Sequence, residues 1–445
     1  MEGSDDRLAW LDSLQGSGIR PGLARTRELL ARAGSPEQRF LSVIVAGTNG
    51  KGSTASTLAS ILRESGYRTG LYTSPHLIDI RERWIIDGAK ISPEALDSAI
   101  GRLRAAAECC PFTPTYFEAL TVTAFIAFEA AACEVAVLEV GMGGRLDATN
   151  VVQPAAALIT TVGMDHTEFL GTTIEEIAAE KAGVIHEGSV AVTSNSDSRV
   201  LGVLKSRAVS VGTELHVTLD ETKVEHVAVD IDRLRFRLTT PVTEYRIESP
   251  LTGEHQTGNI VLAVRGAELL MFRMPKITPA SIAKGVGEVS WRGRLERFEA
   301  PGKSVFVDGG HNSNAADEIA RFVGTRLPPP RTLVFGMMSD KDVESTAAKM
   351  FPLFERIVLT RPDPERAMSL DDLEAIVGKL GRTADRFERP SDAIAHALSL
   401  EPPVVAIFRS LYLAGAAVEY LDRIADPAAA SSSRSDVNNE KPTSP

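Results

Sequence analysis

The sequence predicts an α/β protein in which a mostly parallel sheet domain with a phosphate-binding loop precedes a smaller Rossmann-like domain. The first observation is an apolar run, Phe40–Gly47, that ends in glycine and is followed by a helical pattern over Ser53–Gly66. The second is a repeat of this pattern, in which a buried-type strand over Val135–Val140 leads into the glycine-rich segment GMGG. The third is composition, because 43% hydrophobic and 24% charged residues are typical of a globular chain with its own core.

Further segments of the first domain follow the alternation of apolar and polar residues. The first forty residues read as helical, with polar turns. Helices are expected over Phe117–Ala132 and Ile174–Gly183, and a strand over Ala155–Val162. Between residues 190 and 245 the alternation is stronger, which predicts a mixed or antiparallel portion with fewer helices.

A second α/β set begins near Arg294. Its expected strands are Ser304–Val307, Arg331–Phe335, Arg356–Leu359 and Val404–Phe408. We therefore expect domains at 1–293 and 294–425. The tail, 426–445, is rich in Ser, Ala, Pro and Asn, which predicts disorder.

Charge and cysteine content exclude several classes of protein. A net charge of −11 argues against a general nucleic-acid binder, while an anionic substrate stays compatible with a local positive pocket. The three cysteines have no zinc or disulfide spacing, and the acidic N-terminus lacks an apolar signal core. We expect a cytoplasmic protein that binds neither membranes nor nucleic acid.

The sharpest motif is VAGTNGKGST, Val45–Thr54, placed where a strand gives way to a helix. Glycines there let the backbone approach a phosphate, and the helix N-terminus supplies free N–H donors. Lys51 can neutralise phosphate charge, and Ser53 offers a hydroxyl to Mg²⁺. The spacing departs from the usual P-loop, which would need glycine at Val45 and a hydroxyl residue at Gly52. The alternative is a glycine-rich turn with an incidental lysine.

Acidic and imidazole groups follow two neighbouring strands. Glu139 ends a buried-type strand, where a carboxylate faces the ligand-binding edge of a parallel sheet and can hold Mg²⁺. The alternative roles for Glu139 are a helix cap or an ion pair with Arg145. Asp165 and His166 also follow an apolar strand, although a single histidine is more often structural. Lys181 lies on an amphipathic helix, where a lysine is usually a solvated surface charge.

A further strand-to-loop motif, FVDGGHNSN, opens the second domain. Asp308 at the strand end can hold a ribose or a base, and His311 can reach a phosphate. The alternative is a turn with a local side-chain cap. Arg294, at the expected domain junction, can clamp a phosphate or form an inter-domain salt bridge.

Taken together, these motifs resemble the folylpolyglutamate synthase and dihydrofolate synthase family of the Mur ligase superfamily. The resemblance runs from about Ile19 to Leu421. Its other motifs are TSPHL (Thr73–Leu77), TYFEALT (Thr115–Thr121), DHTEFLG, AEKAGVI, GEHQTGN (Gly253–Asn259), GRLE and SLYLAG (Ser410–Gly415).

The resemblance implies a first domain of the Mur ligase central-domain type and an ATP-dependent amide ligase. Such an enzyme adds L-glutamate to dihydropteroate or folate through an acyl phosphate and releases ADP and phosphate. It also implies a monomer with ATP and two Mg²⁺ ions, and a monovalent cation as a further candidate.

The same resemblance implies roles for individual residues. The triphosphate cradle would consist of Thr48, Asn49, Gly50, Lys51, Gly52 and Ser53. One Mg²⁺ would lie at Ser53 and Glu139 near Ser74, and a second at His166. Lys181 matches a lysine that becomes carbamylated. The nucleotide would also be held by Asn259, Arg294, Asp308 and His311, and the catalytic set would be Lys51, His166, Lys181, Asp308 and His311.

Four positions depart from the family pattern: Gly310, Ser313, Arg292 and Arg409. They bear on the nucleotide and glutamate pockets. Two other functions stay open at this point: a Mur-type ligase for another carboxylate, such as a cell-wall precursor, and a non-catalytic nucleotide-binding paralogue.

Overall fold

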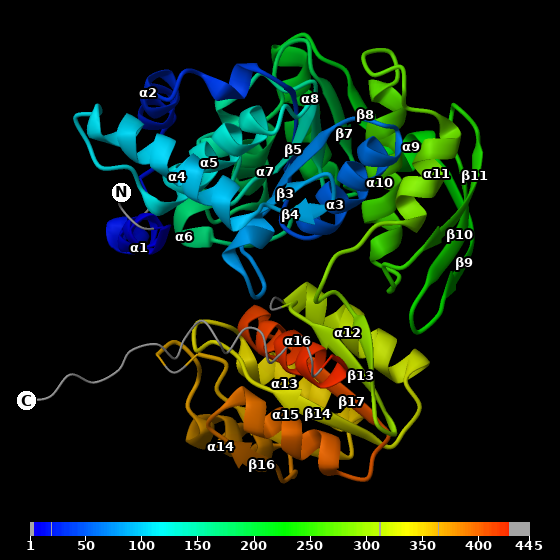
Figure 1. Cartoon of the computed structure of the whole chain (residues 1–445). Helices are drawn as coiled ribbons and strands as arrows, with labels where there is room; N and C mark the ends of the chain where they lie inside the picture. The colour runs from blue at the N-terminus through cyan, green and yellow to red at the C-terminus, as the bar shows by residue number, and fades with distance from the viewer. Residues whose placement is uncertain (1–3, 19, 311–312, 364, 427–445) are drawn as a thin grey trace, which may run out of the picture. The chain divides into compact units, whose positions relative to one another are not determined.

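The computed structural model describes residues 4–18, 20–310, 313–363 and 365–426. The chain forms two compact units (Figure 1). The first contains residues 1–229, 233–250 and 254–291, and the second contains 230–232, 251–253 and everything from Arg292 onward. The predicted tail lies outside the described residues, except Asp426 at its start.

The first unit is built on an eight-stranded sheet in the order β4-β3-β2-β5-β1-β6-β7-β8. Its strands are parallel apart from the small hairpin of β3 and β4, which confirms the predicted mostly parallel sheet. The strands are β1 Leu41–Ala46, β2 Thr69–Tyr72, β3 Trp84–Ile86, β4 Ala89–Lys90, β5 Val135–Glu139, β6 Ala156–Ile159, β7 Val190–Thr193 and β8 Leu215–Val217.

Helices cover both faces of this sheet (Figure 1). Because side chains alternate along a strand, one set of strand residues packs with α4, α5, α7 and α8, while the other set faces α3 and α10. The helices are α1 Ser4–Ser13, α2 Ala24–Arg32, α3 Lys51–Glu64, α4 Pro93–Glu108, α5 Tyr116–Ala130, α6 Thr167–Leu170, α7 Ile174–Ala182, α8 Ser198–Ser210, α9 Thr218–Glu221, α10 Gln256–Leu270 and α11 Pro279–Gly287. This double covering explains the near-continuous apolar runs of the central strands.

The portion between residues 190 and 245 is only partly as predicted. It ends in an antiparallel three-stranded sheet of β9 Lys223–Val229, β10 Leu234–Thr239 and β11 Glu244–Ser249. It begins, however, with a further parallel unit, β7-α8-β8, so the expectation of few helices was wrong for Ser198–Ser210. Helix α8 buries only three side chains, those of Val200, Leu204 and Ala208. Its sequence therefore carries little of the apolar periodicity that indicates a helix.

The second unit is a six-stranded sheet in the order β12-β13-β17-β14-β15-β16, parallel except at β12. The strands are β12 Glu296–Ala300, β13 Lys303–Asp308, β14 Arg331–Phe335, β15 Arg356–Thr360, β16 Asp385–Phe387 and β17 Val404–Phe408. The helices are α12 Ser313–Arg326, α13 Val343–Met350, α14 Leu370–Lys379, α15 Pro390–Ser399 and α16 Leu411–Ala425. This open sheet agrees with the predicted Rossmann-like unit, although the sequence did not indicate the edge strands β12 and β16. No helix in the described ranges combines the length and the apolar character needed to cross a membrane.

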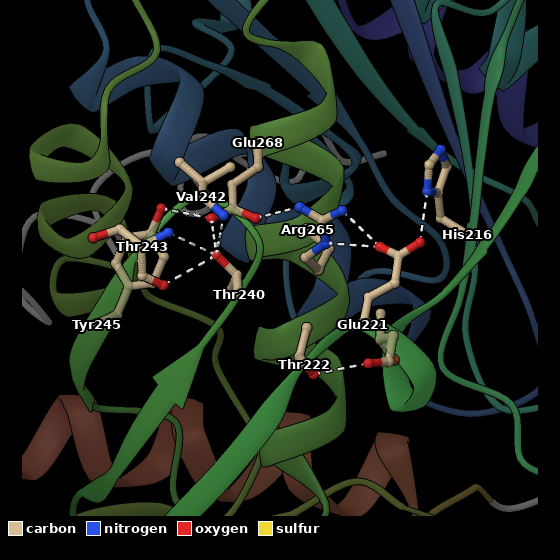
Figure 2. Close-up of polar contacts among 10 residues, drawn as sticks. His216, Glu221, Thr222, Thr240, Val242, Thr243, Tyr245, Arg265 and Glu268 are labelled. Atoms are coloured by element: carbon tan, nitrogen blue, oxygen red, sulfur yellow. Dashed lines mark hydrogen bonds and ion pairs between the residues drawn. The ribbon is translucent and has the colours of Figure 1, made fainter.

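A buried chain of charged groups ties α10 to α9 and to the antiparallel sheet (Figure 2). The guanidinium of Arg265 bonds to Glu268 and, at 2.6 Å, to Glu221, whose other oxygen lies 2.7 Å from His216 Nδ1. Glu268 also accepts a hydrogen bond from the Tyr245 hydroxyl at 2.8 Å, and burial beside this carboxylate raises the pKa of Tyr245. Side-chain exposure is 4% for Arg265 and 0% for Glu268, so each charge depends on the other for compensation.

Replacing Arg265 with Met should lower the free energy of unfolding by about 3–5 kcal/mol, because Glu268 would stay buried without its counter-charge. Urea denaturation measures the change. Arg199→Met is the control, since Arg199 is 61% exposed in its pair with Asp197 and should cost about 1 kcal/mol or less. Equal losses for the two variants would contradict the role given to the buried network.

Candidate functional site

The loop between β1 and α3 carries the geometry of an anion site. Gly47 and Gly50 have φ values of 145° and 83°, a region that favours glycine, and Gly50 caps the N-terminus of α3. The α3 helix has no acidic residue in its first turn. Its first N–H groups, beginning at Lys51, therefore face outward with a partial positive charge. The predicted strand, loop and helix are present, although the helix begins two residues earlier than expected.

The segment after β6 fixes this loop in place. The Thr48 N–H donates to Thr161 O at 2.8 Å, and the Thr48 hydroxyl exchanges hydrogen bonds of 3.1 Å with the backbone of Gly163. The chain then continues directly into Asp165 and His166. The structure thus brings the segment that leads to Asp165 and His166 beside the phosphate loop, as expected from its place after a strand of the same sheet.

Two close contacts explain the glycines of the loop. A Cβ on Gly50 would overlap the amide of Asn259, which is 7% exposed on α10. A Cβ on Gly52 would lie 2.5 Å from the ring of Trp291. Any larger residue at position 52, where a usual P-loop has a hydroxyl residue, would therefore have to displace the Trp291 ring. Sequence reasoning missed Trp291, and no local signal linked it to the loop.

Two lysines flank the loop. Lys51 Nζ donates to Thr48 O at 3.3 Å, and Lys181 Nζ donates to Gly47 O at 2.9 Å. Lys181 is 3% exposed, so the reading of a solvated surface charge was wrong. Burial, and then the nearby charge of Lys51, lower the pKa of Lys181 to about 7. A substantial share of this amine is therefore neutral at physiological pH.

A carboxylate and hydroxyls lie near the same sheet edge. Glu139 pairs in register with Val45 on β1, is 5% exposed, and accepts a hydrogen bond from Ser74 N–H at 3.1 Å. Ser53 is 3% exposed in the first turn of α3. Arg145 pairs with Glu180 at 2.6 Å, so the alternative of a Glu139–Arg145 pair finds no support. Within the described ranges, no three His, Cys, Asp or Glu side chains group as metal ligands, and His166 is 49% exposed with φ 47°.

A cavity of about 400 Å³ opens beside this edge, within the first unit. Its walls include Phe117, Asp147, Phe169 and Leu170, together with Glu118 and Met142. Asp147 is buried and accepts hydrogen bonds of 3.0 Å from the N–H groups of Gly141 and Met142. Burial raises the pKa of Asp147, and these hydrogen bonds offset part of that effect.

Sequence reasoning did not select the lining residues of this cavity. A signal for Asp147 was present in the GMGGRLDATN segment. A second missed residue is Arg83, whose side chain is 7% exposed and donates to His76 Nδ1 at 2.9 Å. The carbonyl oxygen of Arg83 accepts a hydrogen bond from the N–H of Thr73, the residue before Ser74. Arg83 is therefore a buried cation near this strand end.

The candidate residues of the second unit lie at the end of β13. Asp308 is 4% exposed and accepts hydrogen bonds from Leu295 N–H at 2.9 Å and Gly310 N–H at 2.6 Å. Arg294 donates to Gly293 O at 3.0 Å. Asp308 thus organises its own turn, in line with the alternative reading. His311 lies outside the described residues.

The departures from the family pattern have distinct settings. Arg409, at the end of β17, is 1% exposed, has φ 88° and donates to Thr346 Oγ1 at 3.4 Å. Burial lowers the pKa of Arg409 to about 10. Arg292 pairs with Glu296 and Asp422 at the surface. Gly310 serves the Asp308 turn, and the side chain of Ser313 lies outside the described part of the chain.

Comparison with known proteins gives a consistent result. Residues 45–267 match the Mur ligase middle domain, and residues 293–407 match the Mur ligase glutamate ligase domain. The chain is 33% identical over 376 residues to the dihydrofolate synthase/folylpolyglutamate synthase of Bacillus subtilis, covering 83% of this chain and 87% of that one.

Solved structures agree with these matches. The Mycobacterium tuberculosis folylpolyglutamate synthase, solved with ADP and AMPPCP, is 31% identical with a TM-score of 0.85 and covers 95% of this chain and 99% of its own. Escherichia coli FolC, solved with DHPP and ADP, is 26% identical with a TM-score of 0.83 and covers 94% and 98%.

Replacing Gly52 with Ser restores the usual P-loop hydroxyl but should impair the protein. The new side chain would press on Trp291 and displace the first turn of α3, at a cost of about 1–3 kcal/mol. We expect nucleotide affinity, measured by calorimetry, to fall at least about tenfold. Gly202→Ser on α8 is the control, because a Cβ there meets nothing within 4 Å. Equal nucleotide affinity in both variants would refute the constraint.

Proposed function

The chain belongs to the folylpolyglutamate synthase and dihydrofolate synthase family of the Mur ligase superfamily, and we propose that the loop between β1 and α3 is the phosphate site of its ligase reaction. It is an ATP-dependent ligase that adds glutamate to a folate-type acid. The observation that carries the proposal is the convergence of a glycine-shaped helix N-terminus, Lys51, the buried Lys181 and the buried Glu139 on one sheet edge. A different carboxylate substrate and a non-catalytic role both lose support from these relatives.

The acid substrate is assigned to the cavity beside this edge. Its aromatic and aliphatic walls suit a flat ring system, and its charged lining residues, which include Arg20, Glu118 and Arg145, suit polar substituents on such a ring. Asp147, whose two carboxyl oxygens accept hydrogen bonds from Gly141, Met142 and Thr149, fixes the shape of the loop that forms one wall. Met142 and Phe169 belong to segments that follow β5 and β6, so the cavity adjoins the strand ends that flank the phosphate loop.

Activation requires an oxygen of the substrate carboxylate to attack the γ-phosphorus, with ADP as the leaving group. The N–H groups at the start of α3 and the ammonium of Lys51 would stabilise charge on the transferring phosphoryl group. Thr48 and Asn49 would hold the loop through Thr161. The product of this step is an acyl phosphate, in which the carbonyl carbon is ready for nucleophilic attack.

The residues at this edge fit Mg²⁺ bound together with a nucleotide. Glu139 and the Ser53 hydroxyl would supply hard oxygen ligands, with Ser74 beside them, and phosphate oxygens complete such a site. When bound, the ion would offset phosphate charge. We assign a second ion to His166 and a carbamylated Lys181, supported by the low pKa of that amine.

In the second step the amine of glutamate attacks the acyl carbon, phosphate leaves, and the amine nitrogen loses a proton. We assign Asn259 to the nucleotide, supported by its contact with Gly50. Arg294, Asp308 and His311 of the second unit are assigned to the nucleotide on family resemblance alone. The three free thiols support a reducing, cytoplasmic setting. The monomeric state, the monovalent cation, and the lack of nucleic-acid and membrane binding stay predictions.

Incubation with ATP, Mg²⁺, glutamate and either dihydropteroate or a folate tests the function by mass spectrometry. We expect a gain of one glutamyl residue on at least one acid, and successive gains for a polyglutamating enzyme. Lys51→Ala should reduce this product at least about a thousandfold, because a phosphate-binding cation is lost. Lys205→Ala on α8 is the control. ADP release that needs neither acid nor glutamate would contradict the proposal.

The neutral amine of Lys181 predicts a pH dependence. Only that form adds CO₂, so carbamate, detected by NMR with ¹³C-bicarbonate, should be lost as pH falls below about 7. The folded-state pKa lies below the ordinary 10.5, so the penalty for burying this cation is full below pH 7 and fades as pH rises toward 10.5. Lys181→Met lacks the amine that would carry the carbamate, so it should be inactive. It also lacks the buried cation, so its free energy of unfolding at pH 6 should exceed that of the wild type. Carbamate that persists unchanged at pH 6 would argue against this assignment.

A further inference from the structure

Phe169 is a large apolar side chain that the fold leaves uncovered. It is 56% exposed, although it lines the cavity assigned to the acid substrate. Exposing much of a phenyl ring forgoes the gain from its burial. The position of Phe169 follows from α6, which is anchored by a neighbouring residue.

The anchor is the next residue, Leu170. It is 7% exposed, and its Cδ2 lies 3.0 Å from where a Cβ on Gly143 would stand. The N–H groups of Phe169 and Leu170 both donate to His166 O, at 2.9 and 3.0 Å. Leu170 thus turns into the GMGG segment, and Phe169 is left to border the cavity.

Phe117 forms a second aromatic wall. The ring of Phe117 on α5 lies so close to Gly141 that a Cβ there would overlap it, and its centroid is 6.4 Å from that of Tyr72. Two phenyl rings, those of Phe117 and Phe169, therefore border one cavity. A flat aromatic ring matches a cavity with two phenyl walls.

We infer that Phe169 is a specificity-determining residue that covers the ring system of the acid substrate, with Phe117 as the second aromatic wall. This inference rests on the proposed function and adds the residue that selects a flat aromatic acid. The bound acid would bury the exposed ring of Phe169. Because α6 follows His166 directly, the same contact would also restrain the segment that carries this histidine.

The test compares Phe169→Ala with Phe169→Trp in the full chain. The measurements are the dissociation constant of dihydropteroate, from its fluorescence in the presence of a non-hydrolysable ATP analogue, and the KM values of all three substrates. Loss of the ring should raise the dissociation constant and the KM of the acid about 5- to 100-fold. The KM values for ATP and glutamate should stay within about twofold. For Phe169→Trp, the dissociation constant and the KM of the acid should stay within about threefold of the wild-type values, because an aromatic ring is kept.

Phe272→Ala is the matched control, since Phe272 is 70% exposed and does not line the cavity. If Phe169→Ala binds the acid as tightly as the wild type and turnover is intact, the inference about Phe169 is overturned and the proposed function stands. If the wild type binds the acid but adds no glutamate to it, only the proposed function is contradicted. The comparison of dissociation constants would then still decide the role of Phe169. A wild type that binds no folate-type acid would overturn both. A thermal melt identifies a misfolded variant, and Phe169→Leu then replaces it.

Discussion

The hydrogen bond from Thr48 N–H to Thr161 O joins the phosphate loop to the neighbouring strand end. It places two segments that are far apart in sequence at one edge of the sheet. The first supplies Lys51 and the N-terminus of α3, and the second supplies His166 and, through α6, one wall of the cavity. The proposed chemistry depends on this edge, because phosphoryl transfer requires the attacking carboxylate and the γ-phosphate to meet in a fixed geometry.

Buried charge is used in two different ways in this unit. Around Arg265 each charge has a partner, and the outcome is a fixed attachment between α10 and the antiparallel sheet (Figure 2). Around Lys181 burial and the charge of Lys51 outweigh the carboxylates of Asp165 and Asp147, and the outcome is an amine with a depressed pKa. A cation held in this way lowers stability, which is the usual sign of a group kept for reaction and not for folding.

The sequence indicated the elements that bear strong patterns. Strands β1, β5, β6 and β17 are continuous apolar runs ended by glycine or polar residues, and each was predicted at its place. Helix α8 and the short edge strands were missed, because they bury few side chains. The glycines of the loop were read correctly as backbone features, but their steric partners, Asn259 and Trp291, lie more than 200 positions away along the chain, beyond the reach of local pattern.

Lys181 shows the limit of reasoning from residue type. On its own helix it occupies an ordinary position for a surface lysine, and only the packing of α7 against the end of β1 buries it. The family resemblance selected it where physics applied to the sequence did not. Phe169 and Asp147 are the opposite case, since the motifs that contain them were recognised, yet the cavity they share became visible only in three dimensions.

The most direct test of the central claim is a crystal structure of the chain with Mg²⁺ and a non-hydrolysable ATP analogue. Our account predicts phosphate oxygens on the N–H groups at the start of α3, the ammonium of Lys51 beside them, and Mg²⁺ bound by Ser53 and Glu139. A nucleotide bound elsewhere, with the segment from Gly47 to Ser53 free of phosphate, would contradict it.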